Sequence, residues 1–355
     1  MNGLNNDAIA CALATLCGQG YANVYLDIPI TEKTKSELIS FTRAEWITKG
    51  ILLEDEQGEE KKGIVLNFSG GYDSLAARAL LPEDTQLVAM EFGGWFEREA
   101  DFFKRFAPWT VKTNFRQLGF DRESWTFMGC GAMLVGKALN AKYNVFGNIL
   151  EASDKHMSCS DTFISDDARL PFATAGMQDV KVVMGLTEVG TAIIITHYYP
   201  EYVNESLKSL AAKGSEKLYR KQVLTEIVRN KFRRDMEPVE FDVPNADKVA
   251  MPFGKNLALD FLALYELKHV GVETVSHTVK DIPQEAIDLA QRLTLRFYER
   301  AHPAYMQSIP EELRQGCVEK MHAAGVVEYD DQDWMEFQQV KRFLSRWHQG
   351  LAETV

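Results

Sequence analysis

A short run of small and oxygen-bearing residues, SGGYDS at residues 69–74, has the composition of an anion-binding turn. The β-forming run IVLNF (64–68) precedes it, and an Ala-rich, helix-compatible run (75–81) follows it. A strand, a glycine turn and a helix in this order direct backbone N–H groups and the positive end of a helix dipole toward an anion. Adjacent glycines allow positive φ and a close approach of the main chain. We therefore predict a phosphate-binding loop.

The hexapeptide resembles the SGGxDS signature of the PP-loop ATP pyrophosphatase superfamily. Members of that superfamily cleave ATP between the α and β phosphates and use the AMP moiety to activate a substrate oxygen. The resemblance implies ATP and Mg²⁺ as ligands, with Asp73 helping to hold the metal and with Ser69, Asp73 and Ser74 in catalytic roles. The loop residues that would bind the nucleotide are Ser69, Gly70, Gly71, Tyr72, Asp73 and Ser74. The alternative is a plain turn between strand and helix, in which Asp73 or Ser74 caps the helix.

The elements that must position this loop alternate between strand and helix. Strands are predicted at 64–68, 86–92, 109–114 and 143–149, and helices at 74–81, 96–106 and 128–140. This alternation is typical of an α/β fold with a parallel twisted sheet and helices on both faces. The resemblance makes the sheet HUP- or PP-loop-like. Ligands of such sheets lie at the carboxyl ends of the strands.

Further site residues follow from the same resemblance. In PP-loop proteins the segment after the second strand takes the adenine through main-chain groups, and a glycine near the end of the fourth strand adjoins the nucleotide. Glu91, Phe92 and Gly147 would therefore be nucleotide contacts. For Gly147 the alternative is a glycine required by close packing.

Lys181 is a candidate catalytic residue on a weaker likeness. Residues 179–190 and the run TAIIITHYY (191–199) are predicted to continue as a helix, a turn and a strand. The placement of Lys181 is similar to that of a basic residue facing the phosphates in the 7-cyano-7-deazaguanine synthase branch. A lysine on a helix surface is the alternative. That branch also carries a cysteine-rich zinc segment, whereas residues 214–224 of this chain contain no cysteine.

The polar stretch 151–169 is predicted as a long loop beside the site. Its acidic and histidine side chains could supply metal ligands or acid–base groups, or could be ordinary solvated side chains. These residues are Asp154, His156, Asp161, Asp166 and Asp167.

The 355 residues divide by pattern into three parts. Residues 1–62 read as a small α/β unit with a strand at 22–29 and a helix at 31–46, and 63–200 as the ATP-binding domain. Residues 201–355 are mainly helical and would complete a substrate pocket, pack over the nucleotide domain or form a homodimer surface.

Charge and cysteine content limit the partners. A formal charge of −12 argues against a broad nucleic-acid surface. The basic residues between 217 and 234 are more typical of a solvated helix face than of a tRNA contact. No apolar run approaches the length of a membrane span, and the five cysteines include no CxxC pair. We expect a cytoplasmic protein with reduced thiols and no membrane partner.

The function expected from these features is an AMP- and pyrophosphate-forming ligase. It would adenylate a small-molecule substrate for attack by an amine or by ammonia, either free or delivered by a donor protein. One alternative is sulfur transfer through a persulfide on Cys159 or Cys130, fed by a sulfur-donor protein. Another is a sensor that binds ATP or AMP without turnover.

Overall fold

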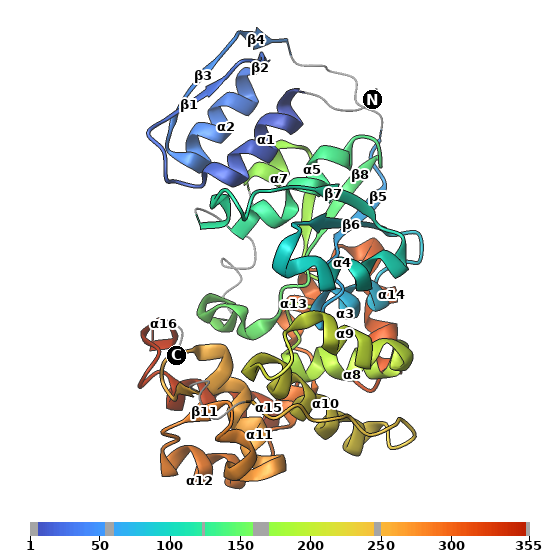
Figure 1. Ribbon diagram of the computed structural model, residues 1–355, viewed down its shortest axis with the longest axis vertical. Coiled ribbons are helices and arrows are strands. Elements are labelled where there is room, and N and C mark those ends of the chain that lie inside the picture. The colour runs from blue at the N-terminus through green and yellow to red at the C-terminus, as the bar shows by residue number, and fades with distance from the viewer. Residues whose placement is uncertain (1–5, 54–59, 123–124, 159–169, 245–249, 353–355) are drawn as a thin grey trace. The chain divides into compact units, whose positions relative to one another are not determined.

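A computed structural model describes residues 6–53, 60–122, 125–158, 170–244 and 250–352. The chain forms two compact units (Figure 1). The first contains 1–69, 83–146 and 167–180, and the second contains 70–82, 147–166 and 181–355. Each unit therefore combines segments that are distant in sequence. The division predicted from the sequence, 1–62, 63–200 and 201–355, follows chain order and stays a prediction.

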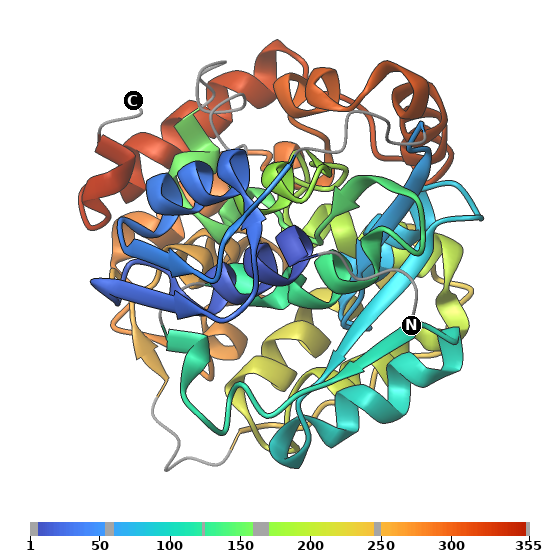
Figure 2. The same cartoon turned by 90° about the horizontal axis from the view of Figure 1, so that it is seen from above.

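The first unit is built on a five-stranded parallel sheet (Figure 1 and Figure 2). Its order is β7-β6-β5-β8-β9. The strands are β5 (Gly63–Asn67), β6 (Gln86–Glu91), β7 (Trp109–Lys112), β8 (Ala141–Val145) and β9 (Gln178–Val180). The predicted α/β class with a parallel sheet is confirmed. The chain adds β6 and β7 on one side of β5 and β8 and β9 on the other, so the strand order reverses between β5 and β8.

A chain of buried amides and a carboxylate ties the middle of this sheet together. Asn144 on β8 is fully buried, and its Nδ2 donates to Oδ1 of Asp179 on β9 at 2.8 Å. Asn67 at the end of β5 donates to Oδ1 of Asn144 at 2.8 Å and to the carbonyl of Val145 at 3.0 Å. These bonds fix the register of β5, β8 and β9 near the carboxyl ends of β5 and β8.

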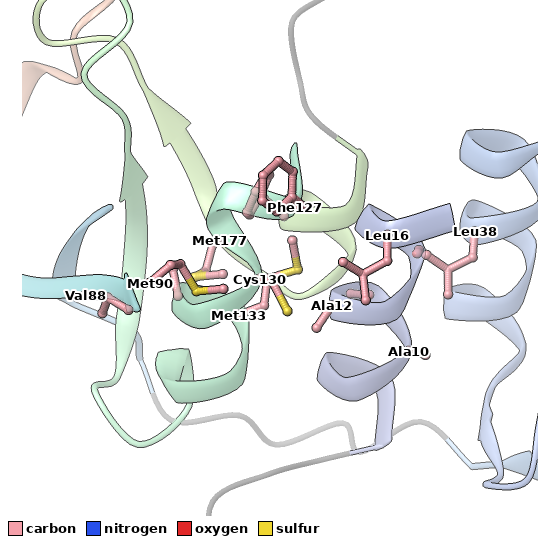
Figure 3. Close-up of a cluster of buried hydrophobic side chains, with 14 of the residues drawn as sticks. Ala10, Ala12, Leu16, Leu38, Val88, Met90, Phe127, Cys130, Met133 and Met177 are labelled. Carbon is pink, nitrogen blue, oxygen red and sulfur yellow. The ribbon is translucent and has the colours of Figure 1, made fainter. Parts of the chain in front are cut away.

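The sheet buries its apolar face under helices of the same unit (Figure 3). Helix α5 (Cys130–Gly136) packs on β5 and β6, and helix α1 (Asn6–Cys17) packs on α5. Close packing at α5 depends on Gly131, because a Cβ there would lie 2.8 Å from the sulfur of Met90. Further α-helices among the described residues of this unit are α2 (Glu32–Thr42), α4 (Glu97–Phe103) and α7 (Leu170–Thr174).

The N-terminal part of this unit differs from its prediction in one element. Two short parallel pairs form, β1 (Asn23–Leu26) with β3 (Glu45–Thr48) and β2 (Ile30–Thr31) with β4 (Ile51–Leu52). The helix predicted over 31–46 ends at Thr42, because Arg43 takes a left-handed conformation with φ 58°. The next residues turn back as β3, which buries Trp46.

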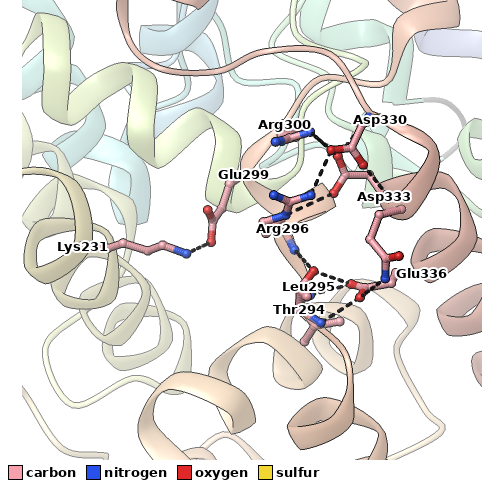
Figure 4. A network of polar contacts seen from close by, with 10 residues as sticks. Lys231, Thr294, Leu295, Arg296, Glu299, Arg300, Asp330, Asp333 and Glu336 are labelled. Carbon is pink, nitrogen blue, oxygen red and sulfur yellow. Dashed lines mark hydrogen bonds and ion pairs between the residues drawn. The ribbon is translucent and has the colours of Figure 1, made fainter.

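The second unit is mainly helical, as predicted for the C-terminal region. Its helices are α3 (Tyr72–Leu80), α8 (Glu188–Tyr198), α9 (Val203–Leu210), α10 (Glu216–Phe232), α11 (Leu257–Val275), α12 (Gln284–Arg292), α13 (Pro303–Ser308), α14 (Glu311–Ala323), α15 (Asp331–Leu344) and α16 (Gln349–Ala352). A balanced network of charges, Arg296 and Arg300 with Asp330 and Asp333, anchors the start of α15 (Figure 4). Within the described residues, no helix combines the length and apolar character that crossing a membrane requires.

The elements predicted at 179–199 are wrong. Residues 179–190, predicted as a helix and a turn, contain the end of β9, an irregular connection and the first residues of α8, and the predicted strand 191–199 lies in α8 up to Tyr198. The β-branched run of α8 is typical of a strand, yet it is buried on every side, and burial removes the periodicity that would mark a helix. Thr187 caps the helix by accepting hydrogen bonds from the N–H groups of Val189 and Gly190.

We expect Asn144→Leu to destabilise the first unit. The substitution removes the buried acceptor of Asn67 and the donor to Asp179. Leaving buried polar groups without these partners should lower the free energy of unfolding by about 2–4 kcal/mol. Urea denaturation measures the change, with Asn114→Leu at an exposed asparagine as the control. Equal midpoints for both variants would contradict a structural role for the Asn67–Asn144–Asp179 chain.

Candidate functional site

The predicted phosphate loop adopts a specific backbone shape. Gly70 has φ +77°, a left-handed conformation that favours glycine. Gly71 is the N-cap of α3 with φ −73°, and it makes no side-chain capping bond. Asp73 and Ser74 lie inside the first turn of the helix, and the Ser74 hydroxyl donates to the carbonyl of Gly71 at 3.0 Å. Neither side chain is the cap that a plain turn would use.

Other segments of the second unit hold this loop in place. The hydroxyl of Ser206 donates to the carbonyl of Gly70 at 2.9 Å. Tyr72 is buried, and its hydroxyl lies 2.8 Å from that of Thr225 on α10. The Tyr72 side chain, at the variable position of the hexapeptide, therefore anchors the start of α3 to α10. Ser69 ends the first of the three chain segments of the first unit and directly precedes Gly70 in sequence.

Gly147 meets the loop by direct packing. A Cβ on Gly147 would lie 2.6 Å from the amide nitrogen of Ser74 and 2.7 Å from the carbonyl carbon of Asp73. Only a residue without a side chain allows this approach. Close packing thus accounts for the glycine by itself, and its contact with a nucleotide stays a prediction.

Asp73 points into a cluster of charged side chains from four segments of the second unit. The hydroxyl of Thr191 on α8 lies 3.2 Å from Oδ1 of Asp73. Burial raises the pKa of Asp73, the charge of Lys221 opposes that rise, and the charge of Glu188 adds to it. Asp73 is thus a carboxyl whose ionisation depends on its charged neighbours.

Glu188, the first residue of α8, carries the main ion pair of the cluster. Its Oε2 lies 2.9 Å from Nη1 of Arg220 and 3.1 Å from Nζ of Lys221, both on α10. Burial alone would raise the pKa of Glu188, but the two cations outweigh it and lower the pKa to about 2. Glu188 is therefore ionised, with its charge compensated inside the protein.

Glu151 is the most unusual carboxyl of the cluster. It lies in η5 (Leu150–Ala152), four residues after Gly147, and is 2% exposed. Its Oε1 accepts the N–H of Glu188 at 2.6 Å, whereas its Oε2 is buried without a hydrogen-bond partner among the described residues. Burial and the negative charges of Glu188 and Asp73 raise the pKa of Glu151 to about 8.

Glu266 on α11 extends the cluster on the side of Arg220. It is 1% exposed, and its Oε1 has no hydrogen-bond partner in the described part of the chain. Burial raises the pKa of Glu266 to about 8 although the Arg220 guanidinium lowers it. Four carboxyls, those of Asp73, Glu151, Glu188 and Glu266, thus interact with one another around Arg220 and Lys221.

Sequence reasoning found Asp73 but missed most of this cluster. Arg220 and Lys221 were predicted on a solvated helix face, and both are buried. Glu151 stood at the start of a predicted polar loop, and Glu188 near the end of a segment predicted as a helix and a turn, where the structure instead begins α8. The available signal was the hydroxyl–acid pair Thr187-Glu188, which is typical of a helix start.

Lys181 lies elsewhere than predicted. It directly follows β9 and is buried, so the alternative of a lysine on a helix surface is wrong. Its catalytic role stays a prediction.

Glu91 and Phe92 belong to the first unit. Glu91 ends β6, and its carboxylate lies 3.6 Å from Nζ of Lys112 and 3.8 Å from Nζ of Lys104. The ring of Phe92 is buried beside those of Phe96 and Phe127. The Phe92 side chain thus has a packing role, which leaves its main chain for the predicted adenine contact. That these two residues join the loop in one nucleotide site stays a prediction.

In the described part of the polar stretch after η5, two of the predicted candidate side chains contact nearby main-chain groups. His156 is buried, its Nδ1 lies 3.0 Å from the carbonyl of Ile149, and Asp154 bonds to the N–H of Lys155. Asp161, Asp166 and Asp167 lie outside the described residues, as does Cys159. Cys130 is buried, and burial raises the pKa of its thiol to about 12, which is unfavourable for a nucleophilic sulfur.

Comparison of the chain with models of protein families, with curated proteins and with solved structures found no match. Among the residues that the structure describes, no group of three or more His, Cys, Asp and Glu side chains is arranged to hold a metal ion.

We expect Gly147→Ala to destabilise the protein without any ligand present. The added methyl group would press on the main chain of Asp73 and Ser74, which cannot move aside as a flexible side chain could. A loss of about 1–3 kcal/mol in the free energy of unfolding is expected. Gly316→Ala on α14 is the control, since a Cβ there meets no atom within 4 Å and should be neutral or stabilising. Unchanged stability of Gly147→Ala would show that packing does not require this glycine.

Glu151→Gln should change how stability depends on pH. The carboxyl has a pKa of about 8 in the native protein, above the ordinary value near 4.3 for a glutamate in an unfolded chain. Between these values the native state binds more protons than the unfolded state, so stability falls as the pH rises from about 5 to about 8. Glutamine cannot lose a proton, so the Tm of the variant should rise relative to wild type across this range.

The experiment is a series of melting curves from pH 5 to pH 8 for wild type, Glu151→Gln and the exposed-residue control Glu273→Gln. Because Glu266 is present in all three proteins, the difference between the curves isolates Glu151. Parallel curves for wild type and Glu151→Gln would contradict the raised pKa.

Proposed function

We propose that this protein is an ATP-dependent enzyme of PP-loop type that forms AMP and pyrophosphate. The observation that carries the proposal is the start of α3, where Gly70 takes positive φ and the N-cap is a second glycine, Gly71, which has no side chain to occupy the helix start. The chain enters this loop from β5, the central strand, next to the point where the strand order reverses. A helix start in that position suits phosphate oxygens. The strand order is also compatible with a HUP-like fold.

The charges around Asp73 fit Mg²⁺ bound together with a nucleotide. Mg²⁺ prefers oxygen ligands and usually binds through one or two carboxylates and the substrate phosphates. Asp73 would hold the ion, and Thr191 orients the Asp73 carboxylate. When bound, the ion neutralises phosphate charge. Glu188 is less suited to a metal, because its carboxylate already pairs with Arg220 and Lys221.

The remaining groups of the site have roles that follow from their chemistry. Main-chain N–H groups at the start of α3, with Ser69 and Ser74, would stabilise negative charge on pyrophosphate. Glu151 offers a carboxyl with a pKa of about 8, and its Oε2 could take the proton that an amine or ammonium nucleophile must lose. This chemistry supports a ligase that adenylates a small-molecule substrate for attack by an amine or ammonia. The sulfur-transfer alternative rests on Cys159, outside the described residues. A cytoplasmic location, a homodimer and an ammonia-donor protein stay predictions.

The test of this proposal is product analysis with ATP, Mg²⁺, ammonium and pools of carboxylate metabolites. AMP and pyrophosphate should appear together, and candidate substrates should support exchange of labelled pyrophosphate into ATP. Asp73→Asn should lower this turnover by at least about 100-fold with little change in Tm. Asp288→Asn on α12, at an exposed aspartate, is the matched control.

Each other outcome contradicts part of the proposal. Formation of ADP would contradict cleavage between the α and β phosphates. Tight ATP binding by calorimetry without turnover in any pool would favour the sensor. Full activity of Asp73→Asn would remove the loop from the mechanism.

A further inference from the structure

The basic residues near the end of α10 are mostly neutralised inside the protein. Arg229 pairs with Glu226 at 2.8 Å, and Arg233 pairs with Asp235 at 2.8 Å. Lys231 pairs with Glu299 (Figure 4). These pairings make the region unsuitable as a broad surface for nucleic acid.

Arg234 is different from its basic neighbours. Its Nε donates to the carbonyl of Asn230 at 2.8 Å, and within the described residues its guanidinium makes no ion pair with a carboxylate. Arg234 is exposed at the edge of a cavity, which leaves its two terminal nitrogens able to bind an anion.

The cavity lies in the second unit between α10, residues 241–243 and α11. Its volume is about 730 Å³, within the range of small-molecule pockets. All three segments contribute apolar side chains, and α10 also contributes polar ones, including Glu226, whose charge Arg229 neutralises. The apolar part of the wall is formed by Val223, Ile227, Phe241, Val243 and Val270. None of Asp73, Glu151 and Glu188 lines this cavity, so it is distinct from the proposed ATP site.

Two residues that line the cavity carry polar side-chain groups for which no hydrogen bond is found among the described residues. These groups are the hydroxyl of Tyr219 and the imidazole of His269. The Tyr219 ring also lies 6.1 Å from the ring of Phe241, which gives the cavity an aromatic wall. A flat apolar body could stack there while one polar substituent bonds to Tyr219 or His269.

A break in α11 shapes the opposite wall. Gly271 interrupts the helix with φ 77° and ψ 172°, a conformation that glycine alone adopts at low cost. Val270 and Thr274, on either side of this break, both line the cavity. The opening is therefore built into the backbone and does not depend on the rotamer of one side chain.

We propose that this cavity binds a small amphipathic anion, with an aromatic or aliphatic body against the apolar walls and its acidic group on Arg234. Lys231, also at the rim, adds positive charge that Glu299 partly neutralises. Binding at this site does not require ATP turnover. The rim cations would create a locally positive potential that attracts an anionic metabolite, although the chain as a whole is negatively charged.

The test compares two fluorescent probes with the same kind of ring system, anilinonaphthalene sulfonate and the uncharged N-phenylnaphthylamine. Wild type should bind both saturably, and the sulfonate more tightly. Val270→Trp should fill the cavity and weaken both probes by at least about 10-fold. Val272→Trp is the matched control, because Val272 is 46% exposed on the same helix and does not line the cavity.

Arg234→Gln keeps the proposal falsifiable if the tryptophan variant fails to fold. It should weaken the sulfonate by about 5- to 10-fold and leave the neutral probe unchanged. Equal affinities of wild type and a folded Val270→Trp, judged by circular dichroism, would place the probes elsewhere and overturn the proposal. An unchanged sulfonate affinity in Arg234→Gln, with only a lower Tm, would mean that Arg234 merely complements the end of α10.

Discussion

The packing of the second unit depends on a buried group of three charges, in which the carboxylate of Glu188 pairs with both Arg220 and Lys221. Moving a charge out of water costs several kcal/mol unless partners compensate it, and here two cations of α10 meet one carboxylate at the start of α8. The same residue donates its N–H to Glu151, so the group also fixes the segment that follows β8. Lys221 further lies 5.5 Å from the ring centre of Tyr72, in the first turn of α3. Three helices and one connecting segment thus take their relative positions from this group.

The shape of the 69–74 loop follows from these neighbours. The Gly70 carbonyl accepts a hydrogen bond from Ser206, and the Asp73 carboxylate accepts one from Thr191. The main chain of Asp73 and Ser74 packs directly against Gly147, which has no side chain. These contacts come from segments far apart in sequence and require no ligand. A loop held in this way loses little conformational freedom when an anion binds, which is the condition for tight and well-oriented binding.

Sequence patterns predicted the elements whose signal is local. The strands at 64–68 and 86–92 have continuous apolar runs bounded by turn residues, and their neighbours alternate regularly, so β5, β6, β7 and β8 were all expected. The incorrect predictions concern residues whose environment is set by segments distant in sequence. The run in α8 is rich in β-branched residues and resembles a strand, because burial on every side leaves no polar face. Arg220 and Lys221 resemble solvated residues until Glu188, more than thirty positions away, is brought beside them. Glu151 sits in a polar stretch, and nothing local marks it as buried.

The excess of buried carboxyls around Asp73 is stronger evidence for a functional site than the pairing of Glu188 with Arg220 and Lys221. A structural network can be balanced, as Arg296 and Arg300 with Asp330 and Asp333 show at the start of α15. Around Glu188, by contrast, Asp73, Glu151 and Glu266 are additional carboxyls whose burial raises their pKa values. Keeping such groups lowers stability near neutral pH, because each must remain protonated or stay buried with its charge poorly compensated. Residues that weaken a fold in this way concentrate where a protein moves protons or binds cations. The surplus of carboxyls lies beside the loop whose shape suits phosphate, and a nucleotide accompanied by a divalent cation would meet both requirements at once.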